Sequence, residues 1–281
     1  MSFKSILAYV DERERCKTLV ETARGLGELH AARVIGLHVV PNVEVYAASE
    51  PQVMADLFES EQRLHEETAS AAHDFFAAAM NGASCESEWR EVAQGGASIA
   101  ERVLEHGLVT DLIITGQIDP DIGSPRRVGT PEHVLMHGGR PQLMVPYIDL
   151  PATLARHVMI AWRASGEAAR AAFDALPLLR HAERVTILEV DPREPEAIEK
   201  VAGGEALASS LERHGVVRAD IVRTPSGGIG IGSTILSRLA DEDADLLVMG
   251  GYGHSRFSEY LFGGATREIL GQMTVPVLIS H

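Results

Sequence analysis

The chain has 281 residues, a length that suggests about two domains, and its 45% hydrophobic and 23% charged residues are ordinary globular proportions. Forty Asp and Glu residues against 25 Lys and Arg residues give a formal net charge of −15, which disfavours binding to a phosphate backbone and thus to nucleic acid. No apolar run approaches the roughly 20 residues that span a bilayer, and Met1–Ser5 leads into strand-like sequence instead of a signal peptide. Cys16 and Cys85 are too few for a disulfide framework. We therefore expect a cytoplasmic protein without a membrane segment.

The predicted strands form two series of short runs rich in Val, Ile and Leu, in the same order in each half of the chain. The matching runs are Ser5–Val10 with Val158–Trp162, Arg33–Pro41 with Arg184–Pro192, Thr110–Gly116 with Ala244–Gly250, and Pro141–Pro146 with Pro276–Ser280. Four matches in one order indicate an internal duplication, so each half is predicted to be one domain. The boundary is expected near Asp149–Thr153, where Pro151 disfavours regular structure, which gives domains of residues 1–150 and 151–281.

Predicted helices alternate with these strands. They cover residues 12–30, about 55–80 and 97–107 in the first half, and 166–181, 194–214 and 232–242 in the second. Strand runs without clean polar alternation are typical of strands buried on both faces, and alternation with helices predicts right-handed βαβ crossovers. The predicted fold class is α/β, with two tandem, doubly wound, mainly parallel five-stranded sheets. The segment Asn42–Gly82 is longer than its counterpart, which predicts a loop or a longer helix there.

The region that begins at Gly250 has the composition of a phosphate site. Open parallel sheets bind ligands at the carboxyl ends of their strands, and Gly250 and Gly253 would let a ligand approach the backbone there. Gly263 and Gly264 precede an amphipathic helix whose free N–H groups and dipole favour an anion, and the hydroxyl of Thr266 adds a donor. The alternative is that these glycines allow only a tight turn and a close contact between helix and sheet.

The spacing of these residues resembles a known nucleotide motif. Gly250-x2-Gly253-x9-Gly263, followed by Thr266, is similar to the G-x2-G-x9-G-[ST]-x-[ST] motif of the universal stress protein (UspA) family, and the resemblance covers both halves of the chain. It implies the Usp fold, which is adenine nucleotide alpha hydrolase-like. It also implies ATP or ADP in the second domain, with the presence of Mg²⁺ left open. The nucleotide-binding residues that it implies are Gly250, Gly253, His254, Arg256, Gly263, Gly264, Ala265 and Thr266, with Arg163 and Val190 near the base or ribose.

Two residues of the second half depart from the family pattern. Gly264 stands where the family has Ser or Thr, which removes a hydroxyl and keeps the backbone donor. Arg163 follows the first strand of this half, where the family has Asp. Its planar guanidinium would either reach phosphate or fill the space of the nucleotide, and the plainest alternative is a solvated side chain in a βα loop.

The first half shows the opposite combination. Asp11 follows its first strand, yet Asp119 stands at the second glycine of the motif, and Asp121 adds more negative charge where phosphate would lie. Gly129–Thr130 is a remaining fragment of the motif. We therefore expect that this half does not hold ATP and that Asp11 serves as a helix N-cap.

Two further patterns favour structural roles. The glycine-rich segment Pro225–Thr234 lacks the spacing of a dinucleotide fingerprint and is interpreted as a turn that leads to an N-cap at Ser233. His133 and His137 share one helix face at a spacing that can hold zinc, but the sequence offers no evident third ligand, so they are interpreted as surface histidines.

The sequence therefore predicts a stress-response regulatory protein that binds an adenine nucleotide in its second domain. The first domain would complete a pseudo-dimer within one chain, paired through Pro141–Val145 and Pro276–Ser280, and a homodimer is left open. Nucleotide binding would order the loop Gly253–Gly263 and change a surface that an unknown protein partner contacts. Because no phosphate loop or nucleophile elbow is present, no catalytic residue is predicted. Two alternatives stay open, namely a nucleotide-independent interaction protein with a vestigial motif and a slow ATPase.

Overall fold

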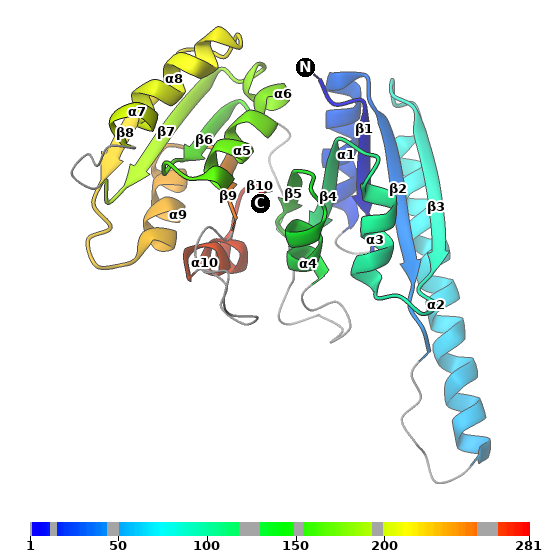
Figure 1. The fold of residues 1–281 in the computed structure, drawn as a ribbon. Helices are drawn as coiled ribbons and strands as arrows, with labels where there is room; N and C mark the ends of the chain where they lie inside the picture. Colours follow the sequence, from blue (N-terminus) through cyan, green and yellow to red (C-terminus); the bar gives the residue numbers. More distant parts are fainter. Residues whose placement is uncertain are drawn as a thin grey trace. The chain divides into compact units, whose positions relative to one another are not determined.

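The computed structural model describes residues 2–11, 16–43, 51–117, 130–148, 154–192, 199–251 and 264–281. These residues form two compact units (Figure 1). The N-terminal unit is Phe3–His137, and the C-terminal unit is Gly138–His281 together with Ser2. The boundary expected at Asp149–Thr153 lies outside the described residues.

In the N-terminal unit the described strands are parallel and lie in the order β3-β2-β1-β4. The strands are β1 (Ser5–Tyr9), β2 (Arg33–Val40), β3 (Ser87–Ala93) and β4 (Leu112–Gly116), and the helices are α1 (Cys16–His30), α2 (Pro51–Met80), α3 (Ile99–Gly107) and α4 (Thr130–His137). Helices α1 and α2 cover one face of this sheet, and α3 and α4 cover the other.

Both faces of this sheet are apolar because each is covered by helices. Leu7, Leu37 and Ile113 lie in one buried cluster with residues of α3 and α4. On the opposite face, Gly36 lies beneath Phe76 of α2, and a Cβ at Gly36 would be 2.7 Å from the ring of Phe76. The strand runs therefore lack polar alternation for the reason that the sequence pattern indicates.

In the C-terminal unit the described strands lie in the order β5-β10-β9-β6-β7-β8. The strands are β5 (Gln142–Val145), β6 (His157–Ala161), β7 (Arg184–Val190), β8 (Asp220–Thr224), β9 (Leu246–Gly250) and β10 (Val277–Ser280). The helices are α5 (Gly166–Asp174), α6 (Leu176–Leu179), α7 (Glu199–Ala202), α8 (Gly204–Arg213), α9 (Ile231–Asp241) and α10 (Gly264–Gln272). Helix α5 packs against β9 and β10, α8 packs against β7, and α9 and α10 contact each other.

Strand β5 pairs antiparallel with β10, whereas the other described pairs in this unit are parallel. Val277 lies opposite Met144, and Leu278 lies opposite Leu143. The last strand segments of the two halves, Pro141–Val145 and Pro276–Ser280, were predicted to pair, and this pairing is thus confirmed. It joins the last strand of the first sequence half to the unit formed by the second half. The α/β fold class with mainly parallel sheets is also confirmed.

Two predicted helices of the second half are each divided into two. The helix predicted over 166–181 is divided into α5 and α6, because Pro177 lies in the first turn of α6, where a missing N–H is tolerated. The helix predicted over 194–214 is divided at Gly203, which is the N-cap of α8. The part of that prediction over residues 194–198 lies outside the described residues.

The N-cap of α9 differs from the prediction. Helix α9 begins at Ile231 with Gly230 as its N-cap, so the predicted N-cap role of Ser233 is wrong. The hydroxyl of Ser233 lies inside the first turn and donates to Glu268 of α10. Gly230 takes the cap position because its backbone has a φ of 95°, which a residue with a side chain rarely adopts.

The extra length of the first half is a long helix, one of the two predicted alternatives. Helix α2 has 30 residues and is about 45 Å long at 1.5 Å per residue. Its buried residues, Ala69, Ala72, Phe76 and Met80, all lie in its second half. Its first half projects beyond the sheet (Figure 1). No helix in the described ranges is both long enough and apolar enough to cross a membrane.

Substitution of two phenylalanines of α2 tests whether its second half packs on the sheet while its first half projects beyond it. Phe76 is 3% exposed and Phe58 is 48% exposed. We expect Phe76→Ala to lower the free energy of unfolding of the N-terminal unit by about 3–5 kcal/mol, because it leaves a cavity between α2 and β2. Phe58→Ala, the matched control, should change it by about 0.5 kcal/mol or less. Urea denaturation followed by circular dichroism measures both, and equal losses would contradict the arrangement.

Candidate functional site

A pocket of about 250 Å³ lies at the carboxyl ends of β6 and β7 in the C-terminal unit. Trp162 and Arg163 follow β6, and Glu189 and Val190 end β7. The lining is completed by Ala164, Asp191, Pro192, Ala202, Gly203 and Ile231. Ligand pockets are typically about 300–1,000 Å³, so this volume suits part of a small molecule, such as a base with its sugar. The pocket lies next to the point where strand order reverses, since β7 and β9 flank β6 on opposite sides.

Glu189 fixes one wall of this pocket. Its Oε1 accepts a hydrogen bond of 3.0 Å from the backbone N–H of Gly204, the first residue of α8. Helix α8 needs this acceptor because its N-cap, Gly203, has no side chain. Oε2 of Glu189 lies 2.8 Å from Nε of Arg223, which also pairs with Glu205. The Arg223 guanidinium offsets the negative charge of Glu189.

The ion pairs of Arg223 shift two pKa values. The hydrogen bond from Arg223 lowers the pKa of Glu205 below its ordinary value. The same bond to Glu205, together with the charges of Glu205 and Glu189, raises the pKa of Arg223. Glu205 and Arg223 are therefore both charged at neutral pH, and the ion pairs of Arg223 link β7, β8 and α8.

Asp191 holds a second wall, the turn between β8 and α9. The backbone N–H of Ser226 donates to Oδ1 of Asp191 over 2.7 Å, and the backbone N–H of Asp191 donates to the carbonyl of Thr224 over 2.9 Å. The hydrogen bonds from Ser226 lower the pKa of Asp191 below its ordinary value of 3.8. The interpretation of Pro225–Thr234 as a turn agrees with the positive φ angles of Gly227 and Gly228.

Arg163 presents a cation to the pocket. The preceding residue, Trp162, is buried, and its indole N–H donates to the carbonyl of Ala202 over 3.0 Å. The backbone at the end of β6 is thereby fixed. The side chain of Arg163 is exposed, and its guanidinium makes no hydrogen bond or ion pair with another residue of the described ranges. A guanidinium has only donors, so Arg163 suits a ligand that offers acceptors such as phosphate or carbonyl oxygens.

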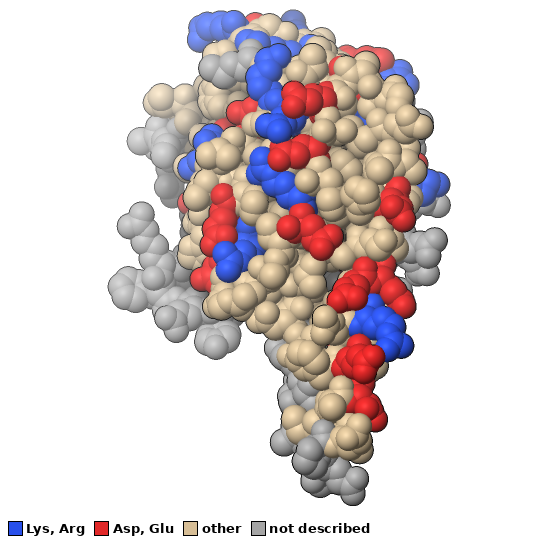
Figure 2. All heavy atoms as spheres, turned by 90° about the vertical axis from the view of Figure 1, so that its right-hand side faces the viewer, with Lys and Arg blue, Asp and Glu red and all other residues tan. Residues whose placement is uncertain are grey.

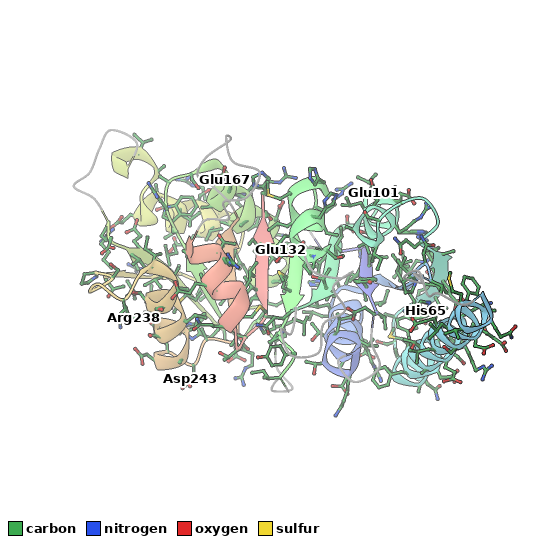
Figure 3. The ribbon with its side chains drawn as sticks, turned by 90° about the horizontal axis from the view of Figure 1, so that it is seen from below. His65, Glu101, Glu132, Glu167, Arg238 and Asp243 are labelled. Atoms are coloured by element: carbon green, nitrogen blue, oxygen red, sulfur yellow. The ribbon has the colours of Figure 1, made fainter. Side chains whose placement is uncertain are left out.

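Gly250 has a steric role at the end of β9. A Cβ at this position would lie 2.5 Å from the backbone nitrogen of Ala168 and 2.6 Å from the carbonyl carbon of Glu167, both at the start of α5. Glu167 is labelled in Figure 3. Because these are backbone atoms, they cannot rotate away as a side chain would. The close contact between helix and sheet, one of the two sequence interpretations, therefore accounts for this glycine.

The other residues of the glycine motif fall into two groups. Gly253, His254, Arg256 and Gly263 lie outside the described residues, as does the loop Gly253–Gly263. Gly264, Ala265 and Thr266 form the first turn of α10, where the N–H groups of a helix are free. Gly264 is exposed with open space around its Cα, and Thr266 is buried.

The structure brings together two of the predicted site residues, Arg163 and Val190, in the pocket. Gly250, Gly264, Ala265 and Thr266 are not part of its described lining. Sequence reasoning missed Trp162, Glu189 and Gly203 as pocket residues. Of these, Glu189 gave a signal, because it is a charged residue next to the end of the apolar run Val185–Leu188.

The histidine pair lies on α4 in the N-terminal unit. The rings of His133 and His137 have their centroids 4.4 Å apart, and both residues are exposed. Within the described ranges, no group of three or more His, Cys, Asp or Glu residues is arranged to hold a metal ion. The structure therefore adds no third ligand to this pair.

Comparisons with known proteins identify the family. The model of the universal stress protein family matches residues 2–117 and 155–281, and the chain belongs to this family. No curated protein matches the chain in sequence. The fold is similar to the crystal structure of a universal stress protein from Archaeoglobus fulgidus DSM 4304, with 17% identity, coverage of 98% of this chain and 97% of that chain, and a TM-score of 0.70. It is also similar to a candidate universal stress protein from Pseudomonas aeruginosa UCBPP-PA14, with 15% identity, coverage of 99% and 93%, and a TM-score of 0.61.

Alanine substitutions at two glycines of the motif distinguish a glycine that helix packing requires from one that it does not require. We expect Gly250→Ala to lower the free energy of unfolding of the C-terminal unit by about 1–3 kcal/mol, since the methyl group would overlap the backbone of α5. Gly264→Ala, with no atom of the described residues within 4 Å of its Cβ position, should change it by about 0.5 kcal/mol or less. Chemical denaturation of both variants measures the difference. A neutral Gly250→Ala would show that α5 can move away from β9.

The bond between Asp191 and Ser226 has a defined pH dependence. The pKa of Asp191 is lowered in the folded protein, so its stabilising bond is fully present above the ordinary value of 3.8 and is lost as the pH falls through the lower folded value. We expect the amide resonance of Ser226 to titrate with a midpoint below 3.8. An NMR titration measures this, with Asp191→Asn as the control that should abolish the titration. A midpoint above 3.8 would contradict the bond.

Proposed function

We propose that the C-terminal unit binds an adenine nucleotide, ATP or ADP, and that its occupancy regulates contact with a protein partner in the stress response. The base and ribose would lie in the pocket of Arg163 and Val190. The phosphates would extend toward the segment between Gly250 and Gly264. Membership of the universal stress protein family supports this reading.

The observation that carries the proposal is Arg163, an exposed cation at the carboxyl edge of the sheet that has no partner among the described residues. Arg163 lines a pocket whose partly buried carboxylate, Glu189, already has a cationic partner. The donors of Arg163 are thus left for a ligand that brings its own acceptors. The free N–H groups at the start of α10, with the hydroxyl of Thr266, are a second set of donors in the same unit, and a helix N-terminus favours phosphate.

Arg163 stands after β6 where the family has Asp, and two roles of its side chain would have opposite effects on nucleotide binding. If Arg163 donates to the nucleotide, its removal weakens binding. If its side chain fills the space of the ligand, its removal strengthens binding. We favour donation, because the side chain is exposed and pairs with no residue in the described ranges, so it is free to turn toward a ligand.

Binding of ATP and ADP, each with and without Mg²⁺, tests the proposal by isothermal titration and thermal shift. We expect saturable binding to the wild-type protein, weakened about tenfold or more in Arg163→Ala, because a hydrogen bond to a charged group contributes about 1.5–3 kcal/mol. Arg213→Ala, which removes an exposed arginine at the end of α8 outside the pocket lining, is the matched control and should bind normally.

Two outcomes would change the proposal. Absence of both heat and thermal shift at saturating ATP and ADP would remove the nucleotide role and favour an interaction protein with a vestigial motif. Tighter binding by Arg163→Ala than by the wild type would keep the pocket but make Arg163 an obstacle to the ligand.

A further inference from the structure

The carboxylate of Glu268 lies in the interface between α9 and α10, which pack side by side in the C-terminal unit (Figure 1). Glu268 belongs to α10, and its Oε1 accepts a hydrogen bond from the hydroxyl of Ser233 in the first turn of α9. Both residues are partly buried. This bond therefore joins the middle of α10 to the beginning of α9.

The beginning of α9 has the space and the electrostatic character that this carboxylate needs. A Cβ at Gly232 would lie 2.8 Å from Cδ of Glu268 and 3.0 Å from its Cβ, so a methyl group there would displace the carboxylate. The N-cap of α9, Gly230, has no side chain that could accept from the first turn. The dipole at the start of a helix favours a negative group, and Glu268 supplies one.

Helix α9 is itself fixed beside the pocket of Arg163. Arg238 of α9, labelled in Figure 3, donates over 3.2 Å to the hydroxyl oxygen of Thr224 at the end of β8. Ile231, the first residue of α9, lines the pocket. Among the described elements, α10 packs chiefly against α9. The position of α10 relative to the pocket is therefore set through α9.

Given the proposed nucleotide site, on which this inference rests, we infer that Glu268 is a positioning residue for the phosphates of the nucleotide. Gly264 precedes Glu268 by four residues, or about one helical turn. The bond from Ser233 to Glu268 thus sets where the free N–H groups of Gly264–Thr266 lie relative to the pocket. Glu268 aligns these phosphate donors with the base and ribose without contacting the nucleotide.

The negative charge of Glu268 has an effect opposite to that of its position. A carboxylate about one turn from the phosphate donors repels a phosphate, so its removal would tighten binding if repulsion were the larger effect. The bond from Ser233 directs the carboxylate toward the start of α9, where the helix dipole offsets part of its charge. Position is therefore the larger effect, and removal of Glu268 weakens binding.

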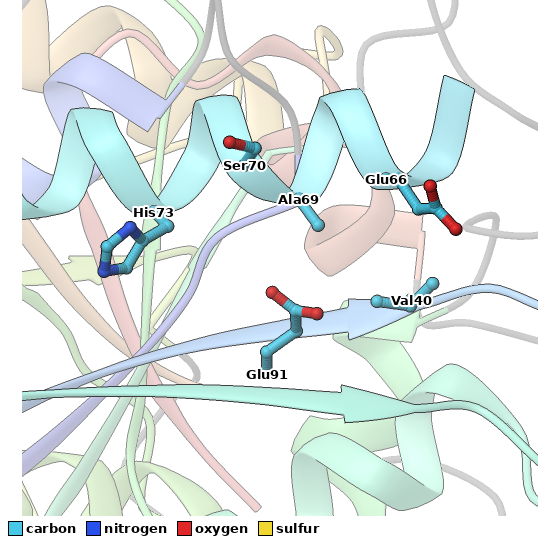
Figure 4. A pocket seen from close by; sticks show the side chains of 6 residues that line it. All are labelled: Val40, Glu66, Ala69, Ser70, His73 and Glu91. Atoms are coloured by element: carbon cyan, nitrogen blue, oxygen red, sulfur yellow. The ribbon is translucent and has the colours of Figure 1, made fainter. Parts of the chain in front are cut away.

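The cavity of the N-terminal unit does not compete for the phosphates. It has a volume of about 370 Å³ and lies where α2 meets β2 and β3 (Figure 4). Glu66 and Glu91 are among its described lining residues, which include no Lys or Arg. Further acidic side chains follow the projecting part of α2 (Figure 2). Because carboxylates repel phosphate, we expect a titration of the full chain to show no nucleotide binding at this cavity.

Isothermal titration of the full chain with ATP, ADP and adenosine tests the inference. We expect Glu268→Ala to weaken binding of ATP and ADP about fivefold or more, as loss of a hydrogen bond does. Its affinity for adenosine, which has no phosphate, should stay within about twofold of the wild type. Glu268→Gln keeps an oxygen that accepts from Ser233, so it should bind ATP within about twofold of the wild type.

Variants of α9 test the same bond from its other side. Ser233→Ala removes the donor, and Gly232→Ala places a methyl group against the carboxylate, so each should weaken ATP binding although α10 is unchanged. Ser237→Ala and Glu212→Ala remove an exposed hydroxyl of α9 and an exposed carboxylate of α8, and these controls should bind ATP normally. Without nucleotide, hydrogen exchange in α10 should be faster in Glu268→Ala than in the wild type.

The outcomes distinguish this inference from the proposed function. A wild-type protein that binds neither ATP nor ADP would overturn the proposed function and the phosphate role of Glu268 with it. If the wild type binds ATP and Glu268→Ala binds it equally well, only the inference fails. It also fails if Glu268→Ala and Glu268→Gln both bind ATP more tightly, if Glu268→Ala loses adenosine as much as ATP, or if hydrogen exchange in α10 is unchanged.

Discussion

Burial of both sheet faces is the constraint on which the rest of this structure depends. Because helices cover the strands on both sides, the buried residues of the central strands are mostly apolar, and buried polar ones such as His38, Thr186 and Ser280 have hydrogen-bond partners. Charged side chains of these strands lie mainly toward the strand ends. In the C-terminal unit the residues that end or follow β6 and β7 supply the arginine and the carboxylates of the pocket.

The duplicated halves have diverged at this edge for steric reasons as well as chemical ones. Gly250 ends β9 and is needed because α5 begins directly against it. Gly116 ends the corresponding strand β4, but among the described residues a Cβ there would meet only Leu19, at 3.9 Å, an ordinary contact. The steric need found at Gly250 is thus not found at Gly116 within the described ranges. Conservation of a motif residue between repeats is not by itself a sign of shared ligand binding.

The fold could be predicted from the sequence to a large extent, because duplication and strand composition are properties of short segments. The pairing of β5 with β10 was expected from the resemblance to the universal stress protein family, in which the last strand pairs with its mate across a two-fold axis. The site was predicted less completely. Glycine spacing does not distinguish a ligand that approaches Gly250 from a helix that approaches it, since both require the same missing Cβ. The roles of Glu189 and Ser233 depend on partners in α8, β8 and α10, which are distant in sequence and meet only in the folded unit.

The position of β5 has a consequence for how the two repeats can be separated. The repeat border in the sequence falls after β5, but this strand pairs with β10 inside the C-terminal unit. A fragment cut at the repeat border would leave β10 with one side of its backbone N–H and C=O groups unpaired. Such an open edge recruits strands from other molecules and favours aggregation. Because β5 supplies the partner strand from the same chain, the backbone groups on this side of β10 are paired without a second molecule.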